Sequence, residues 1–201
     1  VRGSKPGSIL LDASTGAAIA RIDASGIDFK AVLAHGRAHG GHHLRQMSFH
    51  ERALMLKAVG QMLMEKKEQF YQLSFATGAT RPDSWIDIEG GIGTLFAYAS
   101  RGRREFPNET FHVEGMTEPL SKGGTFVGRH ICVPIEGVAV HINAFNFPCW
   151  GMLEKLAPTL LAGVPAIVKP ATVTSYLTEA MVRDGGYQTV MGFFSMTASS
   201  R

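Results

Sequence analysis

Two short apolar segments on either side of a helical pattern limit the fold of this chain more than any other feature of its sequence. The segments are residues 137–142 and 165–170, and residues 150–161 between them carry apolar side chains at helical spacing. Short apolar strands joined through a helix are typical of a parallel sheet with both faces buried. The sequence therefore predicts an α/β fold that contains a strand–helix–strand unit.

Composition limits the class of protein and its surroundings. The 201 residues are 45% hydrophobic and 18% charged, as in a soluble globular chain with one core. The net charge of +3 is too small and too dispersed to indicate binding to nucleic acid or to an anionic membrane. No apolar run approaches the roughly 20 residues that span a bilayer. Two cysteines, Cys132 and Cys149, make no disulfide framework, so we expect a cytoplasmic protein.

The clearest helix start lies at Ser48. Ser48 and Glu51 have the capping-box spacing, in which each side chain can bond the other residue's backbone amide. Apolar residues follow at mostly helical spacing, and Gly78 is a natural helix end. These signals predict one helix between Ser48 and Gly78.

Other elements of the first hundred residues are less sharply marked. They are a hairpin of residues 8–11 and 18–22, a helix from Asp28 to about His39, and a helix from near Asp83 to about Arg101. Gly40 and Gly41 are expected to close the earlier of these two helices. Gly90 and Gly91 fall inside the later one, where glycine is unfavourable.

Residues 106–134 are rich in glycine, proline and alternating apolar and polar side chains. This pattern indicates an extended hairpin instead of a helix. Such a hairpin serves either as an arm that contacts another subunit or as an ordinary sheet edge, and the residues leave both roles open.

Polar residues follow both strands of the predicted unit. Because ligands of parallel sheets collect at the carboxyl ends of strands, residues 143–146 and 169–172 form the candidate site. Asn146 could donate a hydrogen bond to a developing oxyanion, or it could simply cap the helix behind it. Lys169 could bind ribose hydroxyls or a phosphate, or it could be a solvated strand end. From the residues alone, the simpler role is the commoner one in both cases.

Two other groups of reactive residues are better explained without chemistry. Histidines 35, 39, 42 and 43 include an i,i+4 pair that could bind zinc, but no suitably placed Glu or Cys joins them. A polar helix end is the better interpretation, and we predict no metal site. Cys149 has only His141 and Lys155 nearby in sequence to activate it, so we expect a buried core cysteine instead of a nucleophile.

The two strand-end segments together resemble the aldehyde dehydrogenase family. Residues 137–148, which end in Asn146-Phe147-Pro148, are similar to the family segment that ends in Asn-Phe-Pro. Residues 157–171 resemble the next signature, an alanine–proline helix followed by a lysine–proline strand end. The resemblance runs from about Ser8 to Arg183, and it favours the functional roles of Asn146 and Lys169.

Within the family, the closest resemblance is to semialdehyde dehydrogenases of phenylacetate and benzoyl-CoA catabolism. The similar segments are residues 48–53, 76–81, 83–88, 91–100, 119–126 and 141–152. This resemblance implies an acyl-CoA semialdehyde as the small-molecule substrate. It also implies a homo-oligomer in which the hairpin of residues 111–131 is the oligomerisation arm.

The family resemblance also implies roles for single residues. Asn146 would donate to the oxyanion of the thiohemiacetal and would border the cofactor, and Lys169 would bind the adenosine ribose or a phosphate on it. The remaining cofactor-binding residues would be Ile142, Asn143, Ala144, Phe145, Pro170, Ala171 and Thr172. Thr172 stands where NAD-preferring members place a glutamate. A threonine would not repel a 2′-phosphate, so we expect NADP, with NAD as the alternative cofactor.

The resemblance divides the chain into four parts. Residues 1–105 would be the helical part of the cofactor-binding domain, 106–135 the arm, 136–183 the first strand–helix–strand of the dinucleotide-binding sheet, and 184–201 a tail outside the family pattern. The implied fold is the N-terminal part of the aldehyde dehydrogenase fold, an incomplete Rossmann-like parallel sheet with flanking helices and a protruding β-hairpin arm. In the tail, Gly185 and Gly186 are expected to break the preceding helix.

The family's glycine-rich turn, nucleophilic cysteine and general-base glutamate have no counterpart in the tail. We therefore expect this chain alone to bind dinucleotide weakly, to lack turnover, and to be poorly soluble because of an open sheet edge. Two other classes of function stay open. The chain could be a non-catalytic nucleotide-binding module, or a fragment that joins other subunits through the hairpin.

Overall fold

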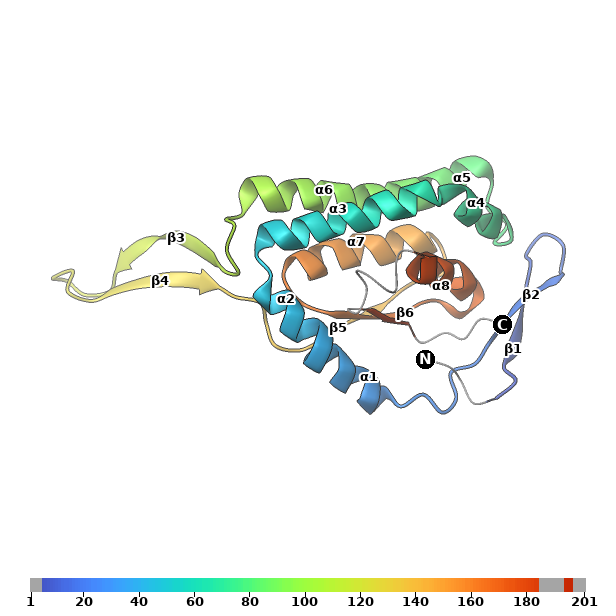
Figure 1. Cartoon of the computed structure of the whole chain (residues 1–201), viewed down its shortest axis with the longest axis horizontal. Coiled ribbons are helices and arrows are strands. Elements are labelled where there is room, and N and C mark those ends of the chain that lie inside the picture. Colours follow the sequence, from blue (N-terminus) through green and yellow to red (C-terminus); the bar gives the residue numbers. More distant parts are fainter. Residues whose placement is uncertain (1–4, 185–193, 197–201) are drawn as a thin grey trace.

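A small parallel sheet lies between two groups of helices (Figure 1). The computed structural model describes residues 5–184 and 194–196. In the sheet, β5 (Ala139–Ile142), β6 (Ala166–Lys169) and β7 (Phe194–Met196) are parallel and adjacent in that order. The predicted strand–helix–strand unit is thus confirmed as β5, α7 (Pro148–Leu161) and β6.

Helices α3 (Phe49–Glu65), α6 (Gly91–Glu105) and α7 form the layer on one side of the sheet (Figure 1). Their buried faces make the main hydrophobic core, which includes Leu56, Leu95 and Leu156, each 0–1% exposed. The remaining elements on this side are α4 (Lys67–Phe75), α5 (Arg81–Trp85), the π-helical η2 (Ile86–Gly90), η3 (Thr172–Thr174) and α8 (Ser175–Asp184). Gly185 and Gly186 lie outside the described residues.

A continuous helix with a π-helical middle covers the other face of the sheet (Figure 1). It consists of α1 (Phe29–His35), the π-helical η1 (Gly36–Gly41) and α2 (His42–Gln46). The prediction that Gly40 and Gly41 end this helix is wrong, because the helix continues through both. A Cβ atom at Gly41 would lie 2.8 Å from Arg45 Nη1 and 3.6 Å from a Pro165 side-chain atom. Gly41 is therefore a buried residue within a continuous helix instead of a helix stop.

The capping box at the start of α3 is confirmed. Ser48 Oγ accepts from the Glu51 amide at 3.2 Å, and Glu51 Oε2 accepts from the Ser48 amide at 2.7 Å. The predicted single helix up to Gly78 is interrupted at Lys66, whose φ of −101° lies outside the helical range. As a result α4 is a separate helix, and Gly78, with φ +85°, lies beyond its end.

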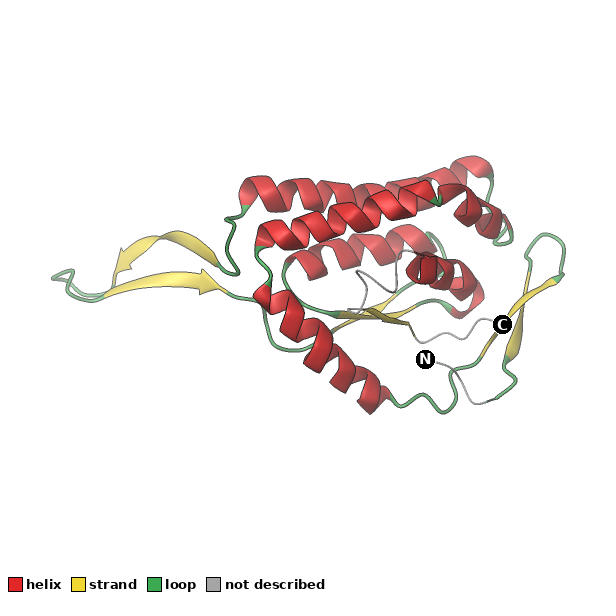
Figure 2. Ribbon diagram, viewed as in Figure 1, coloured by secondary structure: helices red, strands yellow, loops and turns green. Residues whose placement is uncertain are grey.

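Two antiparallel hairpins lie outside this layered body, and Figure 2 shows both as strands that no helix covers. The first pairs β1 (Ser8–Leu11) with β2 (Ala18–Ile22). The second pairs β3 (His112–Pro119) with β4 (Val127–Cys132) and projects away from the helices. Its side chains are largely exposed, including 85% of Met116 and 63% of Phe126.

Two structural findings bear on metal and membrane binding. In the described part of the chain, no three His, Cys, Asp or Glu side chains gather where they could hold a metal ion. The rings of His35 and His39 stack at 4.5 Å on one helix face. None of the helices described is both long and apolar enough to cross a bilayer.

Candidate functional site

The carboxyl ends of β5 and β6 lie level with each other. Ile142 is opposite Lys169 in the register, and the Asn143 amide donates to the Lys169 carbonyl at 3.0 Å. The two loops that follow these strands therefore begin at the same edge of the sheet. This arrangement brings the predicted site residues of both segments, 143–146 and 169–172, to one edge of the sheet, which we call the rim.

One end of the rim borders a cavity of about 610 Å³. Lys169, Pro170 and Thr172 line it, together with residues of the N-terminal hairpin region. The Lys169 side chain is exposed. Asp23 also lines the cavity, but its carboxylate accepts from the Lys5 amide at 2.7 Å and from Ser25 Oγ at 2.7 Å. These bonds lower the pKa of Asp23, with the Ser25 hydroxyl as the largest cause.

Another cavity, of about 510 Å³, contains Asn146. Phe145, Phe147 and the end of α4 also contribute to its lining. Ile142 and Ala144 are exposed, whereas Ala171 is partly buried. Asn143 is only 6% exposed, and in the part of the chain that the structure describes neither polar atom of its side chain has a hydrogen-bond partner.

Asn146 does not cap helix α7. The N-cap position belongs to Phe147, which has a left-handed φ of +51° and makes no side-chain capping bond. Asp87 binds the first free amides of the helix instead, accepting from Trp150 N at 2.8 Å and from Cys149 N at 3.3 Å. Among the described residues the Asn146 side chain has no hydrogen-bond partner, so its amide is available to a ligand.

Asp87 was not identified by the sequence patterns as a site residue. It lies in η2 and is 5% exposed. Burial raises the pKa of its carboxyl, while the Trp150 and Cys149 amides oppose that shift. The only sequence signal was an acidic residue among apolar neighbours of a predicted helix, which gives no indication of a partner 62 residues away.

Gly90 and Gly91 allow α7 to approach this segment closely. A Cβ atom at Gly91 would lie 2.9 Å from Trp150 Cα, and one at Gly90 would overlap the Trp150 indole ring. The two glycines that looked unfavourable within a helix are therefore contact positions. They place the first turn of α7 directly against η2 and α6.

Cys149 is a core residue, as predicted. Its side chain is fully buried, and burial raises the pKa of the thiol well above its usual value, with the nearby Asp87 carboxylate adding to the shift. A thiolate is needed for nucleophilic attack. Cys149 is therefore unsuited to that role.

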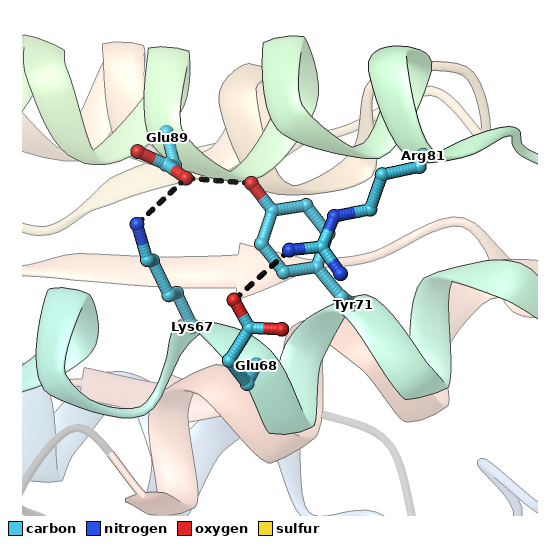
Figure 3. Close-up of polar contacts among 5 residues, drawn as sticks. All are labelled: Lys67, Glu68, Tyr71, Arg81 and Glu89. Atoms are coloured by element: carbon cyan, nitrogen blue, oxygen red, sulfur yellow. Dashed lines mark hydrogen bonds and ion pairs between the residues drawn. The ribbon is translucent and has the colours of Figure 1, made fainter.

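A polar cluster around Glu89 of η2 joins this segment to α4 (Figure 3). Glu89 accepts from the Tyr71 hydroxyl at 2.6 Å and from Lys67 Nζ at 3.0 Å. Arg81 lies over the Tyr71 ring at 4.1 Å and bonds Glu68 at 3.0 Å. The hydrogen bond from Tyr71, followed by that from Lys67, holds the pKa of Glu89 below its usual value. This cluster ties η2 to α4.

We predict that Glu89→Gln lowers the free energy of unfolding at pH 7 by about 1 kcal/mol, since a charge-assisted bond to the buried Tyr71 is weakened. A lowered pKa in the folded state means that the stabilisation is present above the ordinary pKa of 4.5 and is lost as the pH falls below it. Urea unfolding at pH 7 and pH 4 should show the difference shrinking in acid. Glu105→Gln breaks an exposed pair with Arg101 and should cost much less. An equal loss of unfolding free energy at both pH values would contradict a stabilising role for the ionised Glu89 carboxylate.

Comparison with known proteins agrees with this geometry. The aldehyde dehydrogenase family profile matches residues 8–183, and the chain belongs to that family. The 3,4-dehydroadipyl-CoA semialdehyde dehydrogenase of Aromatoleum evansii is 40% identical over 185 residues, which cover 92% of this chain and 36% of that protein. The 2,5-dioxopentanoate dehydrogenase of Saccharolobus solfataricus is 29% identical over 130 residues, 65% of this chain and 25% of that protein.

Solved structures show the same fold. An NAD-dependent benzaldehyde dehydrogenase from Corynebacterium glutamicum has a TM-score of 0.79 at 22% identity, covering 98% of this chain and 41% of its own. Glyceraldehyde-3-phosphate dehydrogenase GapN from Methanocaldococcus jannaschii, solved with NADP, has a TM-score of 0.73 at 16% identity, covering 96% and 41%. The described structure is thus an N-terminal part of the α/β aldehyde dehydrogenase fold, and the chain spans 36% or less of the two curated relatives.

Proposed function

We propose that this chain is the N-terminal part of an NAD(P)-dependent dehydrogenase that oxidises a CoA-linked semialdehyde to the acid. The observation that carries the proposal is the Asn146 amide. It lies in a cavity at the carboxyl end of a parallel strand. The helix behind it is capped by Asp87, so Asn146 is not needed for that role. An exposed amide in this position can stabilise a developing oxyanion without changing its own charge.

The residues of the rim fit a dinucleotide. Lys169 offers a cation and Thr172 a hydroxyl in one cavity, and the exposed end of β5 offers an apolar surface through Ile142 and Phe145. A bound NAD(P) would supply the hydride acceptor. Asn143, Ala144, Pro170 and Ala171 complete the proposed cofactor-binding set.

We place the nucleophilic thiol and the general base outside these 201 residues. Cys149 is buried and unsuited to form a thiolate, and Cys132 is on the hairpin arm. This proposal predicts no turnover by the 201-residue chain alone. The presence of two unpaired cysteines is consistent with a reducing, cytoplasmic location.

The name of one relative supports a substrate class. The Aromatoleum evansii protein at 40% identity acts, by its name, on a CoA semialdehyde. We propose a substrate of the same class, either that of the benzoyl-CoA pathway or the semialdehyde formed when an oxepin-CoA ring opens in phenylacetate catabolism. The exposed apolar residues of the β3–β4 arm support a homo-oligomer.

The test is reduction of NADP and NAD at 340 nm by the complete polypeptide that includes this chain, with an acyl-CoA semialdehyde as substrate. We expect kcat/KM with NADP to equal or exceed that with NAD, because Thr172 carries no charge. Thr172→Glu places a carboxylate in the cavity with Lys169, so it should lower kcat/KM for NADP by about tenfold and leave NAD largely unaffected. A wild-type enzyme that strongly prefers NAD would overturn the cofactor assignment, and no aldehyde-dependent reduction would overturn the function.

A role in assembly is the second candidate, and the arm is the observation that favours it. Met116, Phe126 and Ile131 are exposed on a hairpin that projects from the body. Co-purification of the 201-residue chain with a complete homologous subunit, lost when Met116 and Phe126 are both changed to serine, would favour this role.

A further inference from the structure

The backbone amides in the first turn of α7 have few possible hydrogen-bond partners. Pro148 lacks an amide hydrogen, and the Gly151 amide bonds the Phe147 carbonyl at 2.8 Å. The amides of Cys149 and Trp150 remain, and both point to the carboxylate of Asp87. One buried side chain thus satisfies both free donors at this helix start.

A short, stiff link joins these amides to Asn146. Phe147 has a left-handed backbone, and the ring of the buried Pro148 fixes its own φ. Little freedom is left over the two residues between Asn146 and Cys149. A displacement of the helix start is therefore transmitted to the Asn146 side chain.

Asp87 is itself held from two sides. Glu89, two residues along η2, is bonded to Tyr71 and Lys67 of α4 (Figure 3). Gly91 sets the close contact with the Trp150 backbone. The π-helical segment is thus anchored between α4 and α7.

We propose that Asp87 is a positioning residue that fixes the orientation of Asn146 through the first turn of α7. Asp87 also lines the cavity that contains Asn146, but its two carboxylate oxygens accept from the first amides of α7, so its role is to set where the Asn146 amide points. The inference rests on the proposed function only in taking Asn146 as the oxyanion donor.

The placement can be tested on the 201-residue chain without any activity. Hydrogen–deuterium exchange of the segment 143–151 should be at least about tenfold faster in Asp87→Asn, because a nitrogen that cannot accept replaces one of the two carboxylate oxygens that the backbone amides bond. Asp28→Asn is the matched control, since Asp28 caps α1 by accepting from Ala31 N at 3.0 Å. It should leave this segment unchanged. Unchanged exchange in Asp87→Asn would overturn the proposal. If Asp87→Asn does not fold, Asp87→Glu keeps the charge while displacing the turn, and the same criterion applies.

The effect on chemistry is tested in the complete polypeptide by a double-mutant cycle. Asp87→Asn should lower kcat about tenfold or more, with the KM for NADP changed less than about twofold. In an Asn146→Ala background the same substitution should lower kcat by less than about twofold, because the donor it positions is gone. If the kcat loss of the double variant equalled the product of the two single losses, the two residues would act independently and the positioning role would be overturned. An inactive wild type would refute the proposed function, and the exchange experiment would still decide whether Asp87 holds the turn.

Discussion

Asn146→Ala is expected to lower kcat of the complete dehydrogenase by about 10²–10³-fold, with little change in KM for the cofactor. The side chain is exposed in a cavity, bonds to no other described residue, and leaves helix capping to Asp87. Its removal should therefore take away the proposed donor to the developing oxyanion and little else. Steady-state kinetics with saturating cofactor measure this loss.

A thermal melt separates this role from helix capping. If Asn146 capped α7, its loss would cost about 1 kcal/mol of stability. We expect the melting temperature of Asn146→Ala to match that of the wild type. Asn146→Asp keeps the size but presents a negative charge to the oxyanion, so its kcat should be at least as low. A melting temperature that falls while kcat is preserved would refute the donor role.

The second large effect is on stability. Gly91→Ala is expected to lower the free energy of unfolding by about 1–3 kcal/mol, because the added methyl would meet the Trp150 backbone at 2.9 Å. The contact would be with backbone atoms of Trp150, which cannot rotate away as the end of a side chain can. Either α6 and α7 separate, or the first turn of α7 shifts.

Gly93→Ala is the matched control two residues along α6. A Cβ atom there would have no neighbour within 4 Å, and alanine favours a helix interior over glycine by up to about 1 kcal/mol. Chemical unfolding followed by circular dichroism should therefore show changes of opposite sign. Destabilisation of the same size in both variants would show that the Gly91 contact has no special importance.

Those parts of the fold that rest on local patterns could be predicted from the sequence. The β5–α7–β6 unit follows from apolar runs of strand length around a helical repeat, and the Ser48 capping box requires only residues three apart. The two π-helical segments could not be predicted in this way. Gly41 resembles a helix stop because backbone preference is local, whereas its burial within a continuous helix depends on tertiary structure.

The candidate site shows the same division. Asn146 and Lys169 could be identified because Lys169 ends a strand and Asn146 lies in the loop that follows one. Which role Asn146 has depends on Asp87, and their elements meet only in the folded chain. Whether Lys169 binds a cofactor is a prediction that rests on the family resemblance and on the cavity around it.

The π-helical turn at residues 86–90 has a consequence for how this region can vary. Ser84 before it and Ile92 after it are both fully buried, although the helix is continuous through α5, η2 and α6. Removing one residue from the turn would rotate everything on one side of it by about 100° relative to the other. One of the two buried faces would then point to solvent. The two buried faces on either side of this turn therefore fix its length.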